Sequence, residues 1–151
     1  MSDCDSGLET PQQIAERVRD LMWVNDRASQ SLGIEVLRVA PGEAVLRMRV
    51  REDMLNGHGT CHGGLIAAFA DSAFGFACNT YDELTVASGF GIDLLAPAQL
   101  GDELTATAKE LSRARRTGVY DVDVRNQDGT RIAAFRGRSH TLPGKRITHV
   151  G

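Results

Sequence analysis

The sequence lacks the features that mark disulfide-stabilised secreted proteins. Its 151 residues include only three cysteines, Cys4, Cys61 and Cys78, and no CxxC pair, so a disulfide framework is not expected. The first ten residues are polar and acidic, unlike the apolar core of a secretory signal. We therefore expect reduced thiols in a cytoplasmic protein.

Long apolar runs and an excess of basic residues are also missing. The broadest apolar stretch covers residues 64–78 and is interrupted by Asp71, which makes it too short and too polar to span a bilayer. Lys and Arg number 17 against 20 Asp and Glu, for a net charge of −3, whereas nucleic-acid binders usually carry a basic excess. We expect neither a membrane nor a nucleic acid as a partner.

The composition is that of an ordinary globular protein, with 42% hydrophobic and 25% charged residues. A chain of this length favours one domain. We place that domain at residues 11–143, after a loosely ordered segment at 1–10 and before a tail at 144–151.

The order of the expected elements indicates the fold class. Thr10 and Pro11 form a helix start, and Gly64–Cys78 is rich in alanine and almost free of β-branched residues, which favours a helix buried nearly all round. Alternating patterns predict strands joined as sequential hairpins, and an antiparallel sheet buries one helix by curling around it. We therefore expect an α+β hotdog fold, with one antiparallel sheet wrapped around a long central helix. The expected strands are 34–39, 44–50, 84–95, 102–112, 117–126 and 131–141.

The glycine-rich loop before the central helix carries a family resemblance. Its sequence is LNGHGTCHGG at Leu55–Gly64, followed by ADSAF at Ala70–Phe74. These segments, with Ile92–Asp102 and Arg116–Asp121, resemble hotdog acyl-CoA thioesterases, above all the PaaI type associated with phenylacetate degradation. The resemblance covers residues 11–143. It implies hydrolysis of a thioester between CoA and a small aromatic acid such as phenylacetate or hydroxyphenylacetate, at subunit interfaces, with no metal and no cofactor beyond the CoA of the substrate.

The resemblance also implies roles for individual residues. Asn56, Gly63 and Asp71 fall on the family's catalytic positions, and His62 orients the loop or lines the site. Some relatives place a Ser or Thr one turn after the acid, where this chain has Gly75, so Ser88 is the candidate for a helping hydroxyl. The positions expected to contact substrate are Gly64, Ser88, Gly89, Arg113, Arg116 and Thr117.

The chemistry of these residue types agrees with such roles. The first N–H groups of a helix are unpaired and partly positive, which suits an oxygen that gains negative charge, and Gly63 has no side chain to block the approach. Asp71 is a carboxylate in an apolar helix and serves as a nucleophile or as a general base. The alternatives are that the glycines only shape a tight turn and that Asp71 is bonded to a backbone N–H or to Ser72.

The spacing of Gly63 and Asp71 predicts an oligomer. Eight helical residues correspond to a rise of about 12 Å and a rotation of about 80°, so one carbonyl group cannot reach both residues of one helix. If both act in one reaction, Asp71 meets the Gly63 of a second chain, and a twofold dimer forms two such sites. We expect a dimer at least, and a homotetramer if dimers pair further.

Two local clusters have competing interpretations. Arg113, Arg116 and Thr117 either capture the phosphates of CoA or form a solvated hairpin turn. His58, Cys61 and His62 are spaced like metal ligands, but they lie on a glycine loop without a second ligand group, so no metal site is expected.

Two rival functions stay open at this point. A non-catalytic module that senses acyl-CoA would keep the pocket without turnover, because the fold does not fix the function. A hotdog dehydratase or hydratase is less favoured, because the catalytic histidine pattern of those enzymes is missing.

Overall fold

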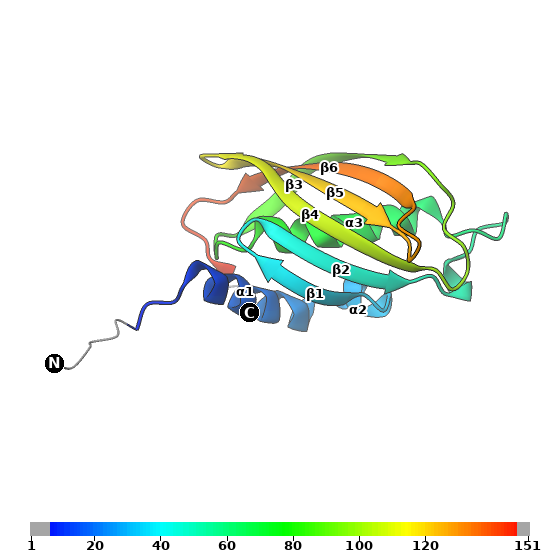
Figure 1. The fold of residues 1–151 in the computed structure, drawn as a ribbon. Helices are drawn as coiled ribbons and strands as arrows, with labels where there is room; N and C mark the ends of the chain where they lie inside the picture. The colour runs from blue at the N-terminus through cyan, green and yellow to red at the C-terminus, as the bar shows by residue number, and fades with distance from the viewer. Residues whose placement is uncertain (1–6, 148–151) are drawn as a thin grey trace.

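The computed structural model describes residues 7–147, in which one six-stranded antiparallel sheet curves around helix α3 (Figure 1). Along the chain, the elements are α1 (Pro11–Asn25), α2 (Arg27–Ser31), β1 (Glu35–Ala40), β2 (Glu43–Arg49), a 3-10 turn η1 (Glu52–Met54), α3 (Gly63–Cys78), β3 (Thr85–Leu94), β4 (Glu103–Ala114), β5 (Thr117–Arg125) and β6 (Arg131–Thr141). The expected α+β hotdog fold is confirmed, and every expected strand is present within two residues of its predicted bounds.

The order of the strands differs in one respect from sequential hairpins. The order is β1-β2-β4-β5-β6-β3, so β3 pairs with β6 and not with β4, which follows it along the chain. The expectation that successive strands form hairpins throughout is therefore wrong for β3. The segment after α3 reaches the far side of the sheet first, which leaves β1 and β3 as the two edge strands.

Local sequence signals explain where helix α1 begins and which face of the sheet packs on α3. Thr10 caps α1 through a capping box with Gln13, and Pro11 occupies the first turn, as its fixed φ allows. In β5, Tyr120 and Val122 point toward α3 and are buried, while Asp121 and Asp123 alternate with them on the outer face. Alternation thus sets which face of the sheet packs on α3.

Helix α3 is buried on one face only. Eight of its residues are buried: Ile66, Phe69, Ala70, Ala73, Phe74, Phe76, Ala77 and Cys78. Ala68, Asp71, Ser72 and Gly75 lie on a half-exposed face. Burial nearly all round is thus wrong for a single chain, because the sheet covers one side of the helix. The aromatic Phe90 is 45% exposed on the edge strand β3.

The beginning and the end of the described chain meet at one carboxylate. Asp82, just after α3, forms ion pairs with Arg17 at 3.3 Å and Arg146 at 3.9 Å, and accepts a hydrogen bond from the N–H of Ile147 at 3.2 Å. Ile147 is buried, so part of the expected tail packs on the domain. Positions 1–6 of the expected loose segment, with Cys4, and positions 148–151 lie outside the described residues. In the described part of the chain, no helix is long and apolar enough to cross a membrane.

Candidate active site

The N-terminus of α3 presents two backbone donors. His62 is the N-cap residue, and its own N–H donates to the carbonyl of Met54 at 2.8 Å. The next two N–H groups, of Gly63 and Gly64, have no acceptor within residues 7–147. Gly64 is exposed and Gly63 is half-exposed, so both donors are available to a bound oxygen atom.

Asn56 organises the loop in front of these donors. Its Oδ1 accepts from the N–H of His58 at 2.9 Å and from the N–H of Thr60 at 3.3 Å, an arrangement typical of asparagine in tight turns. The side-chain amide Nδ2 has no acceptor among the described residues. Asn56 therefore shapes the loop with its oxygen and retains a free donor.

A small cavity joins Asn56 to the helix start. It has a volume of about 270 Å³ and is lined by Asn56, Gly63 and Ile66, with residues 94–98. A Cβ atom at Gly63 would lie 2.6 Å from Cδ1 of Leu94, closer than carbon atoms approach each other. The absence of a side chain at Gly63 thus lets the Leu94 side chain approach the helix start without shifting.

Asp71 lies two turns further along α3, on the half-exposed face. Burial and the negative charge of Asp26, in that order, raise the pKa of the Asp71 carboxyl. Within residues 7–147, no hydrogen bond or ion pair engages this carboxylate. The hydroxyl of Ser72 bonds instead to Ser29, at 2.8 Å, so the alternative in which Ser72 binds Asp71 is wrong. Asp71 does not line the cavity beside Gly63, as the helix geometry requires.

The remaining loop residues lie beside this arrangement. His62 is exposed, and Cys61 is buried, with its N–H donating to the carbonyl of Ala98 at 2.8 Å. Burial raises the pKa of the Cys61 thiol, which disfavours the thiolate form needed in a nucleophile. Within the described chain, no group of three His, Cys, Asp or Glu side chains is arranged to hold a metal ion.

Ser88 and Gly89 lie on the edge strand β3, at a bulge in its pairing with β6. The Ser88 hydroxyl donates to the carbonyl of Arg138 at 3.1 Å, and a Cβ atom at Gly89 would lie 2.6 Å from an Arg138 guanidinium nitrogen. Within one chain, no hydrogen bond of the described residues joins Ser88 to Asp71.

The predicted basic cluster lies at the β4–β5 turn, and its members have different surroundings. Arg113 stacks on the Tyr81 ring at 3.7 Å and pairs with Glu83 at 3.4 Å. Thr117 donates its hydroxyl to the carbonyl of Ala114. Arg116 is exposed, and with Arg115 it lines a cavity of about 840 Å³. The cluster lies near the C-terminal end of α3 and far from Gly63, because its neighbour Tyr81 follows that end of the helix.

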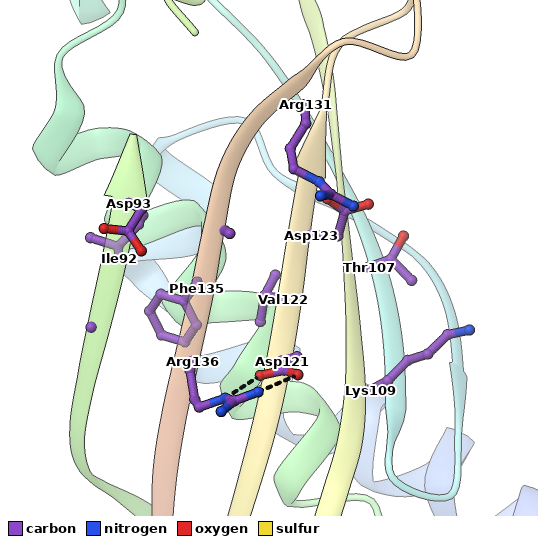
Figure 2. A pocket seen from close by; sticks show the side chains of 12 residues that line it. Ile92, Asp93, Thr107, Lys109, Asp121, Val122, Asp123, Arg131, Phe135 and Arg136 are labelled. Carbon is purple, nitrogen blue, oxygen red and sulfur yellow. Dashed lines mark hydrogen bonds and ion pairs between the residues drawn. The ribbon is translucent and has the colours of Figure 1, made fainter. Parts of the chain in front are cut away.

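Another cavity, of about 850 Å³, lies on the outer face of the sheet (Figure 2). Figure 2 shows Arg136 reaching Asp121, with which it forms two hydrogen bonds of 2.6 and 3.0 Å. None of the residues predicted for catalysis lines this cavity. Two of its acids, Asp121 and Asp123, are paired with Arg136 and Arg131, and with the predicted catalytic residues elsewhere, its size does not make it the site of the chemistry.

Asp26 is a neighbour of the site that the sequence analysis did not single out. It belongs to the junction of α1 and α2, and α2 is too short to show a helical periodicity. Asp is one of the residues preferred at a helix N-cap, which is the signal that could have located α2.

Comparisons with known proteins identify the family of the chain. Residues 58–133, which include Gly63 and Asp71, match the family model described as "Thioesterase superfamily". The chain belongs to the thioesterase superfamily. It is 45% identical over 123 residues to the acyl-coenzyme A thioesterase PaaI of Escherichia coli (strain K12), with 82% of this chain and 88% of that protein covered. The expected resemblance to PaaI-type thioesterases and the expected hydrolase of thioester bonds are thereby confirmed.

Solved structures of this superfamily have the same fold. The E. coli PaaI protein from the phenylacetic acid degradation operon matches with a TM-score of 0.88 and 41% identity, over 90% of this chain and 99% of that chain. A thioesterase protein of Streptococcus pneumoniae TIGR4, solved with coenzyme A, matches with a TM-score of 0.76 and 26% identity, over 85% of this chain and 98% of that one.

Proposed function

We propose that this thioesterase hydrolyses thioesters of CoA with small aromatic acids of the phenylacetate type. One observation carries the assignment of the site: the Asp71 carboxylate has no partner and lies half-exposed among small residues, in the helix whose first N–H groups are unpaired. The substrate class is supported by the similarity to PaaI of the phenylacetic acid degradation operon.

The reaction needs a group that binds the carbonyl oxygen and a group that activates the attacking oxygen. The N–H of Gly63 and the Nδ2 of Asn56 are donors beside one cavity, suited to the oxyanion that forms as the thioester carbonyl is attacked. Asp71 either takes a proton from water or attacks the carbonyl carbon directly. Its raised pKa makes it a stronger base than an ordinary carboxylate.

The two groups come together across two chains in this proposal. Edge strand β3 leaves backbone groups unpaired and exposes Val86, Phe90 and Leu94, features of a strand that pairs with another chain. Antiparallel pairing of two β3 strands joins the sheets of two copies around a twofold axis. The half-exposed face of α3, with Asp71, would then be covered by the second copy, and the tetramer stays a prediction.

The same pairing gives the basic cluster a place in the site. The Thr85 end of β3 pairs with Thr141, whose N–H donates to the Arg116 carbonyl at 2.7 Å. The other end, Leu94, lies against Gly63. In an antiparallel pair the Leu94 end of one copy faces the Thr85 end of the other. Arg116 of one copy would therefore lie near the helix start of the other, where exposed guanidinium groups suit the phosphates of CoA.

The test follows the release of free thiol from phenylacetyl-CoA, hydroxyphenylacetyl-CoA and straight-chain acyl-CoA thioesters. We expect the aromatic substrates to have the highest kcat/KM. Asp71→Asn should lower kcat by about 100-fold or more, in the range of a lost general base, with binding of CoA retained. Asp128→Asn is the matched control, because Asn also suits this exposed turn before Gly129. Undiminished turnover by Asp71→Asn, or no thiol release by the native enzyme as in a sensing module, would contradict the proposal.

A further inference from the structure

Asp26 joins the two N-terminal helices and binds one buried serine. Its backbone ends α1 and begins α2. Its Oδ1 accepts from the N–H of Ser29 at 3.1 Å, and its Oδ2 accepts from the Ser29 hydroxyl at 2.7 Å. Ser29 is only 1% exposed. The Asp26 carboxylate therefore fixes the position and the hydroxyl of a residue that faces the protein interior.

That serine contacts α3 next to Asp71. The Ser29 and Ser72 hydroxyl oxygens are 2.8 Å apart. A carboxylate only accepts hydrogen bonds and each hydroxyl has one proton, so Ser29 donates to Asp26 and Ser72 donates to Ser29. The proton of Ser72 is thus directed toward α2, away from the neighbouring Asp71.

The charges around Asp71 come from few groups. Among the described residues, Asp26 is the charged group that acts on the Asp71 carboxyl, and it raises its pKa in addition to burial. The other titratable neighbour is Cys78 on the same helix, whose pKa burial raises to about 12, so this thiol is neutral near neutral pH. No positive charge on the elements packed against this part of α3 contributes to the pKa of Asp71.

We propose that Asp26 is a positioning residue for the hydrolysis: by way of Ser29 and Ser72 it keeps the Asp71 carboxylate free of the adjacent hydroxyl and places a second negative charge beside it. This inference rests on the proposed function, in which Asp71 takes a proton from water. A carboxylate with no donor and a negative neighbour holds a proton more tightly. Asp26 thereby increases the basicity of Asp71 without touching the substrate.

The experiment compares the pH dependence of kcat/KM for phenylacetyl-CoA in the native protein and in Asp26→Asn. Asn is as good a helix cap as Asp, so α2 should form and the melting temperature should change little. Removing the charge lowers the pKa of Asp71. We therefore expect the acid limb of the profile to move to lower pH, with KM on the plateau unchanged. The carboxyl titration of Asp71, followed by carbon-13 NMR, should move in the same direction.

Asp20→Asn provides the matched control. Asp20 is an exposed acid of α1 that pairs with Arg19, so its removal changes the net charge equally and should leave the acid limb in place. An unmoved limb in Asp26→Asn, with or without a lower melting temperature, overturns the inference, because a purely structural role has no effect on the limb. If Asp71→Asn keeps full turnover, the proposed function fails and this inference with it. If Asp71→Asn is inactive but the acid limb of Asp26→Asn does not move, the inference about Asp26 fails while the proposed function stands.

Discussion

The two ends of helix α3 are built in opposite ways. At its C-terminal end, Asn79 is 4% exposed, and its Nδ2 donates to the carbonyls of Gly75 at 2.9 Å and Thr85 at 3.0 Å, while its Oδ1 accepts from the Thr85 N–H at 2.9 Å. At its N-terminal end, the N–H groups of Gly63 and Gly64 have no acceptor in the described chain. One end of the helix is bonded to the sheet, and the other presents free donors.

The difference follows from what burial demands. A buried amide without partners costs more than 1 kcal/mol, so the bonded end needs a side chain that satisfies every group. The free end is half-exposed, where water satisfies its donors until a ligand replaces it. We infer that Asn79 contributes mainly to stability and Gly63 mainly to the reaction.

The largest expected effect comes from combining two inactive variants. Gly63→Val and Asp71→Asn should each lose about 100-fold or more in kcat, since one blocks the oxyanion donors and the other removes the base. A mixed dimer has one site with both defects and one intact site. Random pairing should therefore restore about a quarter of native thiol release from phenylacetyl-CoA. Mixing that restores nothing would contradict a site built from two chains.

A smaller effect is expected when the bonded end is disrupted. Asn79→Ala removes the acceptor of the buried Thr85 N–H and the side-chain donor to the Gly75 and Thr85 carbonyls, and should lower the free energy of unfolding by about 3 kcal/mol. Urea unfolding at a fixed protein concentration measures this, with kcat of the folded enzyme unchanged. Asn126→Ala is the control, because Asn126 makes similar bonds in the β5–β6 turn at a more exposed position. If Asn126→Ala loses as much stability as Asn79→Ala, the bonded end of α3 is no more important for stability than an exposed turn.

The smallest effect concerns the stability contributed by Asp71. Its pKa is raised in the folded state, so its contribution to stability is full below the pKa of the unfolded carboxyl and is lost as pH rises through the folded pKa. Asp71→Asn should therefore raise the melting temperature near neutral pH, with a smaller difference in acid. Calorimetry at the two pH values measures this. A lower melting temperature of the variant near neutral pH would show that Asp71 stabilises the fold.

The sequence alone predicted those features that depend on local patterns. Alternation located six strands, Thr10 and Pro11 located the start of α1, and the glycine loop followed by an apolar run located α3. Asp71 stood out because burying a carboxylate in an apolar helix is costly unless the group has a partner or a function. Each of these signals lies within a few residues of the chain.

What the sequence did not predict depends on contacts between distant segments. The pairing of β3 with β6 joins residues 39 to 56 positions apart, from Leu94 with Ala133 to Thr85 with Thr141, and no local pattern specifies it. Arg113 was grouped with a free basic cluster, although Tyr81 and Glu83 engage it. The bond from Ser29 to Ser72 spans 43 positions, so the influence of Asp26 on Asp71 appears only once the chain is folded.

The contacts of Asp82 bring the first and the last parts of the described chain to one end of the molecule. Arg17, Arg146 and the N–H of Ile147 converge on this carboxylate, at the bonded end of α3. A helix of 16 residues, about 24 Å in length, separates that end from Gly63 in the same chain. A bulky group attached near Arg17 or Arg146 would thus stay clear of the Asn56 loop of its own chain, whereas in the proposed antiparallel dimer it would lie on the side of the other copy's helix start.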